Sequence, residues 1–485
     1  MQDRDVKLPS GGIADLKAAT DRLGIHWIDH FLRGGHLVVP SPRGSGNLTI
    51  TRVRAVSWNT MILFSDDLAA GVLVSSVLGI GFPIVGVVFL GDAVFVNWGP
   101  GEFGVSAQDL ETFARWAASG LLPGERVSAV SVLIGHENFA HVLHNEVAGL
   151  ERSHRDRAGA AIRIAEVIVT REPLGPLREA LPFIREIPTR HIAPAAIGAE
   201  CEQRPILMIG ATQLSARARQ DVIAFIDRTQ PEQHPELCAA LREAPRPILV
   251  LGFRSHSRVM GNLSEAYLGV VRRLRERYGA VTLILDGFSL PADYDRPDAY
   301  PGWFAWIAGQ CGAVIEAFIP AAREAGASAI FSTADIAVPT ALWMTRQADF
   351  YFTNQGTQQH KAGWFSDAYG VVHGPPDRLT PRDVAWFDGL VDGDRSFAVL
   401  PADLYDVDAD SGDTSAGHRF RDPQEAAARV AELMIAHGLV RAPADQPEPA
   451  PDRPPSRWGR VFGRPLARRL TALMQRGIRP GAGSG

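Results

Sequence analysis

Apolar residues in the first 130 positions gather in short, strand-like runs. Such runs are "HLVVP" and "LTITRVRAVSW", and "PIVGVVFLGDAVFVNW" predicts a β-hairpin with Gly91 and Asp92 at the turn. The stretch "SAQDLETFARWAASG" then has helical periodicity, and Ser106 in front of it is a typical N-cap. Residues 1–130 are therefore expected to form a β-rich N-terminal part.

From about residue 128 the pattern changes to alternating strands and helices. "VSAVSVLIG", "IRIAEVIVT" and "RPILMIG" read as buried strands. Between the first two lies "ENFAHVLHNEVAGLERSH", a predicted helix. Its apolar residues follow helical spacing at Phe139, Val142, Leu143, Val147 and Leu150. Alternation of this kind predicts a mainly parallel sheet over residues 131–235.

The stretch "RTQPEQHPELCAALREAPRP" at 228–247 is polar and contains prolines, which predicts a domain boundary near residues 230–246. A second α/β run follows over residues 236–440, with a last helix beginning at Asp422. Its expected strands are "ILVLGF", "AVTLILDGF", "ASAIFS" and "DFYFTNQ". The fold class predicted from the whole pattern is α/β, with two such units behind the β-rich part.

Residues 68–91 carry no charge and are long enough to cross a bilayer as a helix. Asp66, Asp67 and Asp92 flank the stretch, no nearby Lys or Arg would orient it, and Pro83 interrupts it. Buried core is the preferred interpretation, with a membrane span as the alternative.

Composition narrows the class of protein without naming a function. The chain has 485 residues, is 46% hydrophobic and 21% charged, and carries a net charge of −5, so nothing at this level suggests nucleic-acid binding. Three widely spaced cysteines form no CxxC pair and fit a reducing compartment. "MQDRDVKLPSGG" has no apolar core of a secretory signal, so a cytoplasmic location is expected.

Residues 441–485 are expected to form a proline-rich linker and a basic tail. Seven arginines and no acidic residue lie between 457 and 479, interleaved with apolar side chains. A basic amphipathic helix of this kind can lie on an anionic membrane surface. Peripheral contact with the inner membrane is therefore one interpretation, and a disordered basic tail is the other.

Two loops at expected strand ends carry positive charge. "RSHSRVMGN" supplies Arg254, His256 and Arg258, and "FTNQGTQQHKAGW" contains Lys361, one of three lysines in the chain. Gly356 allows close backbone approach, Thr357 is the expected N-cap, and the N–H groups of a helix start attract anions. We interpret the two loops as converging on a diphosphate. The alternative is that the arginines pair with surface carboxylates and that Lys361 is incidental.

The stretch "GHENFAHVLHNE" holds Glu137 and three histidines. His136 and His141 are five apart, whereas an HExxH zinc site needs histidines four apart, so no metal is expected. On a helix, Asn138, His141 and Asn145 share a face away from the apolar stripe. His141, and after it Glu137, is a candidate general base, while a structural histidine is the alternative.

Three stretches resemble glycosyltransferase family 61 and related bacterial polysaccharide transferases over residues 128–375. "ENFAHVLHNEVAGL" resembles that family's Asn-Phe-x-His segment, and "RSHSRVMGNLSE" its run of Arg254, Arg258, Asn262 and Glu265. "DFYFTNQGTQQHKAGW" takes the place of a late strand followed by a Gly-rich turn. The sequence departs from the family at Val142 and at "GTQ", and His360-Lys361 replaces the family's asparagine.

The resemblance implies a GT-B-like fold, with two Rossmann-like domains facing a cleft. It implies a nucleotide-sugar donor in the second domain, a glycan or lipid-linked acceptor in the first, and no cofactor. The donor would contact a set of residues in the C-terminal unit, in which Asp286 would orient a loop or a ribose: Arg254, His256, Arg258, Asn262, Asp286, Gly356, Thr357, His360 and Lys361.

The predicted function is glycosyl transfer in bacterial surface polysaccharide assembly, independent of metal. A pyruvyl-type transferase on the same architecture and a non-catalytic sugar-nucleotide or polysaccharide-binding component are the alternatives.

Overall fold

The computed structural model describes residues 10–68, 71–76, 81–90, 94–99, 105–120, 127–155, 158–211, 213–255, 259–379, 397–407 and 418–437. These ranges belong to one compact unit, residues 1–438. Within them, three main sheets follow one another along the chain.

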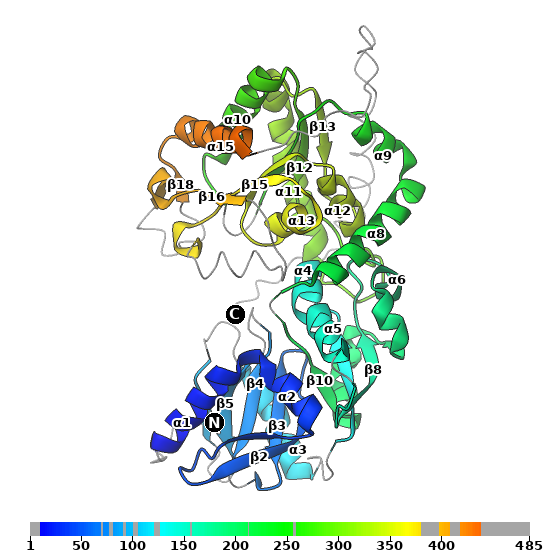
Figure 1. The fold of residues 1–485 in the computed structure, drawn as a ribbon, viewed down its shortest axis with the longest axis vertical. Coiled ribbons are helices and arrows are strands. Elements are labelled where there is room, and N and C mark those ends of the chain that lie inside the picture. The colour runs from blue at the N-terminus through cyan, green and yellow to red at the C-terminus, as the bar shows by residue number, and fades with distance from the viewer. Residues whose placement is uncertain are drawn as a thin grey trace, which may run out of the picture. The chain divides into compact units, whose positions relative to one another are not determined.

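The N-terminal part is an antiparallel meander of six strands in sequence order (Figure 1). Helices α1 (Ser10–Leu23) and α2 (Trp27–Gly34) precede it, joined by the short 3-10 turn η1 (Gly24–His26). Helix α3 (Ala107–Ser119) follows it. The strands are β1 (Leu37–Pro40), β2 (Asn47–Ala55), β3 (Thr60–Ser65), β4 (Val72–Ser76), β5 (Ile84–Phe89) and β6 (Val94–Asn97).

Several sequence predictions for this part are confirmed. Strands β5 and β6 pair as the expected hairpin, although its turn at 91–93 lies outside the described residues. Ser106 caps α3 with a reciprocal bond to Asp109. Within 68–91, the described segments include the buried strands β4 and β5. The prediction of buried core is therefore confirmed for them, and the alternative of a membrane-spanning helix is not.

The middle sheet is parallel, with strand order β10-β7-β8-β9. Its strands are β7 (Ala129–Ile134), β8 (Arg163–Val169), β9 (Thr189–His191) and β10 (Ile206–Met208). Its helical elements are α4 (Phe139–His141), the π-helical segment η4 (Val142–Val147), α5 (Ala148–Arg155), α6 (Leu177–Ala180), η5 (Pro182–Glu186), η6 (Pro194–Ala196) and α7 (Ile197–Gln203). The predicted apolar stripe of the helix after β7 is buried at all five positions.

The polar stretch predicted as a boundary is helical. Helix α8 (Ala216–Gln233) contains Pro231, and α9 (Pro235–Arg242) begins with a proline. A proline in the first turn costs little, because its missing N–H would have no partner within the helix. The stretch is therefore ordered structure, with a tight break between two helices.

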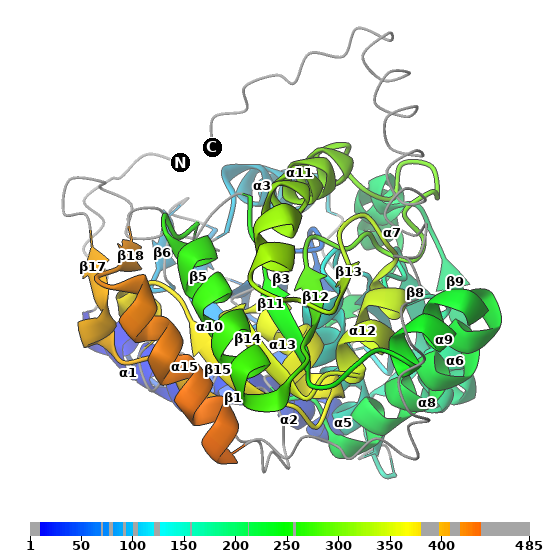
Figure 2. The ribbon, with the colours of Figure 1, turned by 90° about the horizontal axis from the view of Figure 1, so that it is seen from above.

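The third sheet is also parallel, with order β13-β12-β11-β14-β15-β16. Its strands are β11 (Ile248–Gly252), β12 (Thr282–Asp286), β13 (Ala329–Ser332), β14 (Phe350–Asn354), β15 (Tyr369–His373) and β16 (Phe397–Val399). Its helices are α10 (Leu263–Tyr278), α11 (Trp303–Glu324), α12 (Val338–Arg346), α13 (Thr357–Phe365) and α15 (Pro423–His437), with α10 and α15 side by side (Figure 2). Short elements η7 (Pro376–Arg378), η8 (Ala402–Leu404), β17 (Tyr405–Val407) and β18 (His418–Phe420) complete the described part.

Numbered from its first strand, the third sheet has the order 3-2-1-4-5-6 of a doubly wound Rossmann-like fold. The middle sheet has the order 3-2-1-4 of the first part of such a fold. Ligands of these sheets bind beyond the carboxyl ends of the strands where the order reverses. The reversal lies between β7 and β10 in one sheet and between β11 and β14 in the other. The GT-B-like cleft between two such domains stays a prediction.

Helix α11 is long and apolar enough to cross a membrane by length and composition. The core helix of a soluble protein passes the same test, and α11 buries Phe304, Ile307 and Ile315. The helix alone is therefore weak evidence for a membrane location.

Candidate active site

Polar side chains gather where β7 ends, at the reversal point of the middle sheet. Gly135 has φ 138°, a conformation that residues with a side chain rarely adopt. A Cβ at this position would lie 2.1 Å from Thr170 Oγ1. Glycine is therefore required where the chain leaves β7, and it turns the next residues, His136, Glu137 and Asn138, toward partial exposure.

His141 is oriented by a chain of two hydrogen bonds. Asn145 Nδ2 donates to the Ala211 carbonyl (2.6 Å), which directs Asn145 Oδ1 to His141 Nδ1 (2.8 Å). Because an amide oxygen only accepts, His141 Nδ1 carries the proton and Nε2 presents its lone pair. Burial lowers the pKa of His141, and the Asn145 bond partly opposes this. The half-buried imidazole is therefore neutral at pH 7, as a general base needs to be.

His136 adopts the other tautomer, so that its Nε2 is a hydrogen-bond donor. The Asn138 backbone N–H donates to His136 Nδ1 (2.9 Å), so the neutral ring carries its proton on Nε2. Burial, followed by the nearby His141 and Arg171, holds the pKa of His136 well below its ordinary value. The two ring centroids lie 4.6 Å apart. The pair therefore combines an N–H donor and a lone-pair acceptor.

Glu137 and Arg171 add charge beside the two histidines. Burial raises the pKa of Glu137, and the positive charge of Arg171 opposes that rise. Arg171, two residues beyond β8, donates to the Gly135 carbonyl (3.2 Å) and to the Ala299 carbonyl of the loop before α11. Arg171 thus joins the ends of β7 and β8 to the C-terminal α/β unit.

Asn138 links the histidine-containing loop after β7 to the turn that precedes α13. Its Oδ1 accepts the Ala140 N–H and so caps α4 (2.9 Å), which leaves Nδ2 to donate to Thr357 Oγ1 (3.1 Å). The loop after β7 and the turn after β14 are therefore in direct contact, although 219 residues separate them.

The turn after β14 is built as the sequence suggested, with a shift of one residue. Gly356, with φ 96°, is itself the N-cap of α13, and Thr357 is the first helical residue rather than the cap. Arg254 follows β11 across the reversal point and donates to the Gln355 carbonyl (3.3 Å). Arg254 and the first N–H groups of α13 thus lie at the position where a doubly wound sheet binds an anion.

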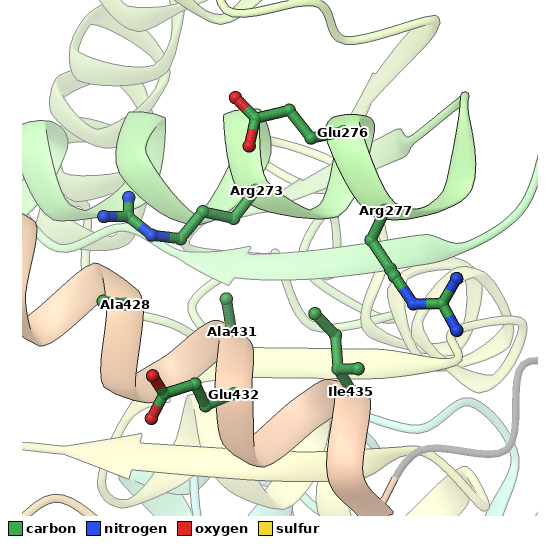
Figure 3. A pocket seen from close by; sticks show the side chains of 7 residues that line it. All are labelled: Arg273, Glu276, Arg277, Ala428, Ala431, Glu432 and Ile435. Carbon is green, nitrogen blue, oxygen red and sulfur yellow. The ribbon is translucent and has the colours of Figure 1, made fainter.

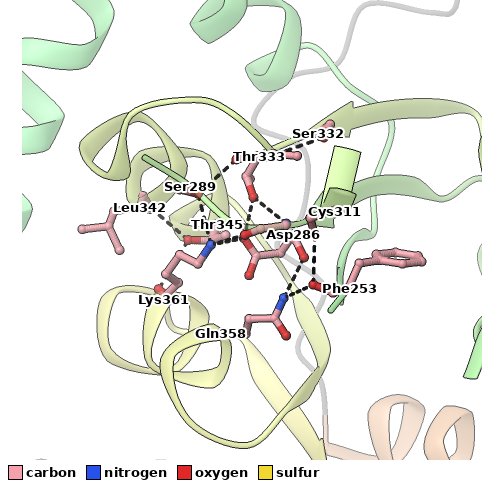
Figure 4. A network of polar contacts seen from close by, with 12 residues as sticks. Phe253, Asp286, Ser289, Cys311, Ser332, Thr333, Leu342, Thr345, Gln358 and Lys361 are labelled. Carbon is pink, nitrogen blue, oxygen red and sulfur yellow. Dashed lines mark hydrogen bonds and ion pairs between the residues drawn. The ribbon is translucent and has the colours of Figure 1, made fainter. Parts of the chain in front are cut away.

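Lys361 has a different environment from the one expected of a ligand-facing charge. Its Nζ donates to Asp286 Oδ1 (2.6 Å), the Gly287 carbonyl (2.8 Å) and Ser289 Oγ (3.1 Å), and the side chain is 3% exposed (Figure 4). All three donors of the ammonium group are engaged. Asp286 is likewise fully buried, so it orients a loop, one of its two expected roles, and does not reach a ribose.

The network around Lys361 fixes the start of α13. Gln358 Nε2 donates to the carbonyls of Phe253 (2.6 Å) and Asp286 (2.9 Å), and Thr333 Oγ1 donates to Asp286 Oδ1 (2.5 Å), as Figure 4 shows. The ends of β11 and β12 are thereby tied to the helix that follows Gly356. Lys361 therefore stabilises the turn at Gly356 through its bonds to the loop after β12 and has no ligand-facing position.

Two further expected donor contacts are corrected. Asn262 exchanges both amide bonds with the Phe420 backbone (2.8 and 2.9 Å), so it extends β18. His360 is buried and stacks on Trp364 with ring centroids 4.0 Å apart. The amide of Asn262 is thus engaged by backbone, and the imidazole of His360 lies in the core. His256, Arg258 and the basic segment 457–479 lie outside the described residues.

The residues described in the structure contain no group of three or more His, Cys, Asp or Glu side chains arranged to hold a metal ion. A separate surface depression of about 370 Å³ lies between α10 and α15 (Figure 3). Two arginines and two glutamates line it, together with small apolar residues: Arg273, Glu276, Arg277, Ala428, Ala431, Glu432 and Ile435. Its mixed charge indicates no ligand class.

Sequence reasoning missed three members of the site. Arg171 follows no motif, Glu146 ends the stretch "GHENFAHVLHNE" but was given no role, and Trp58, whose ring is T-shaped to that of His136 at 5.8 Å, comes from the N-terminal sheet. Position directly after a predicted strand could have drawn attention to Arg171. No local signal could have linked Trp58 to the site, because the contact depends on how the sheets pack.

Glu146 supports the loop that carries His136. Its Oε2 accepts the backbone N–H groups of Gly135 (2.9 Å) and His136 (3.1 Å). Burial raises its pKa from 4.5 to about 7, against the opposing effect of those bonds and Arg171. The native carboxyl therefore binds a proton between about pH 4.5 and 7 that the unfolded chain releases, and stability falls as pH rises through this window.

We expect Glu146→Gln to remove most of that pH dependence. The amide keeps the acceptor oxygen and cannot ionise, so the stability of the variant relative to the wild type should rise by roughly 2.5 kcal/mol between pH 5 and pH 8. Urea unfolding of both proteins at pH 5, 6, 7 and 8 measures the difference. Equal slopes against pH in the two proteins would contradict the assignment of a proton to buried Glu146.

Comparisons with known proteins add little. No family model matches the chain, and no curated protein does either. Among solved structures, the glycosyl transferase family 9 protein from Veillonella parvula DSM 2008 covers 64% of this chain and 97% of its own length, at 10% identity and TM-score 0.36. A likeness at that level establishes neither the fold nor the function of this chain. The resemblance to family 61 thus stays a hypothesis that depends on the three motifs.

Proposed function

We propose that the protein is a glycosyltransferase that moves a sugar from a nucleotide-sugar to a glycan or lipid-linked acceptor in bacterial surface polysaccharide assembly. The Asn138–Thr357 contact carries the proposal, because it joins a neutral, accessible base to the anion-binding end of a doubly wound sheet. A glycosyl transfer needs both of these parts next to each other.

The proposed step uses this chain's own groups. The acceptor oxygen attacks the anomeric carbon, and the bond from that carbon to the phosphate oxygen breaks. His141 Nε2 takes the acceptor proton, and the nucleoside diphosphate leaves with the electron pair. Arg254 and the N–H groups at the start of α13 would stabilise the charge on the leaving group, so that no metal is needed.

A nucleotide screen tests the donor assignment. UDP, GDP or CMP should raise the melting temperature, since a ligand at 100 times its dissociation constant adds about 2.7 kcal/mol to stability. Arg254→Ala should remove most of that shift. Arg323→Ala, on an exposed residue near the end of α11, is the matched control and should retain it.

Slow hydrolysis of the matching nucleotide-sugar, measured as released nucleotide, would then establish an enzyme and should persist in excess chelator. Binding without hydrolysis or transfer would favour the non-catalytic alternative. An unchanged nucleotide shift in Arg254→Ala would contradict the assigned position of the diphosphate.

A further inference from the structure

Trp58 projects from the N-terminal sheet next to the histidine pair. It lies in the turn between β2 and β3, is 49% exposed, and meets His136 with an interplanar angle of 79°. A single exposed apolar side chain is common on protein surfaces, so the position of Trp58, and not its exposure alone, sets it apart. This large apolar ring lies directly beside the polar residues of the candidate site, where a substrate would meet it.

The turn that carries Trp58 is held firmly. The Val56 N–H donates to the Thr60 carbonyl (2.8 Å), and the Asn59 N–H donates to Ser57 Oγ (3.2 Å). Thr60 Oγ1 in turn donates to buried Asp109 (2.8 Å). The backbone that presents the indole is thus fixed before any ligand arrives, which lowers the entropy cost of binding.

The groups around Trp58 match the chemistry of a sugar ring. A pyranose has an apolar C–H face and a rim of hydroxyl groups that both donate and accept hydrogen bonds. Trp58 offers a flat apolar face, His136 Nε2–H offers a donor, and His141 Nε2 offers an acceptor. A nucleobase would also stack on an indole. The anion-binding turn at Gly356 and Arg254, however, belongs to the third sheet, whereas Trp58 lies beside a histidine that follows the middle sheet.

We propose that Trp58 is the platform on which the acceptor sugar stacks, with His136 and His141 bonding to neighbouring hydroxyl groups of the same ring. The inference rests on the proposed function and narrows it: the acceptor's reactive end is a pyranose, and the N-terminal sheet contributes to acceptor selection. Trp58 contacts the substrate and takes no part in proton transfer.

Saturation-transfer NMR with free methyl glycosides tests the platform without a donor. The probes are the methyl pyranosides of glucose, galactose, mannose and N-acetylglucosamine. At least one should show transfer to its ring C–H protons. The dissociation constant should rise about tenfold in Trp58→Ala, a loss of 1.4 kcal/mol, and much less in Trp58→Phe. Trp306→Ala, which removes another exposed tryptophan, should behave like the wild type.

The outcomes separate this inference from the proposed function. Glycoside binding that depends on Trp58 supports the platform even if no nucleotide-sugar is hydrolysed. In that case the glycosyltransferase assignment is contradicted and the sugar platform is kept. Nucleotide-sugar hydrolysis together with glycoside binding that Trp58→Ala leaves unchanged overturns the platform alone. Loss of the nucleotide-induced melting shift in Trp58→Ala indicates base stacking and overturns it, as does the absence of any glycoside signal with the wild-type protein.

Discussion

Replacing His141 with alanine is expected to lower the rate of glycosyl transfer by about a thousandfold, because general base catalysis contributes 10²–10⁴-fold. His141 Nε2 is the lone-pair nitrogen that Asn145 orients, and the side chain is partly exposed at the last residue of α4. Nucleotide binding should change little, since the anion-binding turn belongs to another sheet. Initial rates with the identified donor, together with the nucleotide-induced melting shift, measure both effects.

Two comparison variants sharpen this experiment. His36→Ala removes an exposed histidine whose Nδ1 is paired with the Gly34 carbonyl, and it should retain full activity. Asn145→Ala leaves His141 without its orienting acceptor, so the rate should fall by an intermediate amount. Because the Asn145 bond raises the pKa of His141, the lower arm of the pH–rate profile should shift to lower pH. Full activity in His141→Ala would exclude His141 as the base and direct attention to Glu137.

The predictable part of the site is the part that local sequence determines. The helix after β7 has apolar residues at helical spacing, and burying that stripe turns Asn138 and His141 away from the core. Strand–helix alternation likewise indicates parallel sheets. The tautomer of His141 could not be predicted from local sequence. It depends on the backbone carbonyl of Ala211, which lies in a different connection between strands.

The wrong assignments share one physical cause. Asn262, His360 and Lys361 lie at or near helix starts behind strand ends, where residues facing a ligand and residues facing the core look alike in sequence. Their partners are Phe420, Trp364 and Asp286. Asp286 is 75 residues before Lys361, and the contact forms only because α13, which follows β14, packs behind the ends of β11 and β12. Strand order therefore decides which charges are buried, and local patterns do not encode it.

The burial of Lys361 leads to the second large expected effect. Lys361→Met should lower the free energy of unfolding by about 3–5 kcal/mol, because it leaves the Asp286 carboxylate buried without its counter-charge. Methionine has a similar volume, so loss of packing contributes little. Urea unfolding followed by circular dichroism measures the change. The variant should also weaken nucleotide binding indirectly, because Gln358 and the start of α13 depend on the same network.

Another lysine of this chain provides a matched control. Lys17 forms an ion pair with Asp21 one turn along α1, with both side chains about half exposed. Lys17→Met should therefore cost less than about 1 kcal/mol, as for surface pairs in general. The double replacement Lys361→Met with Asp286→Asn removes both buried charges, and it should recover at least half of the loss, since two partners in contact are not additive. If Lys361→Met instead kept its unfolding midpoint and lost only nucleotide binding, Lys361 would be a ligand-facing charge after all, and the buried pair with Asp286 would not be the form that binds substrate.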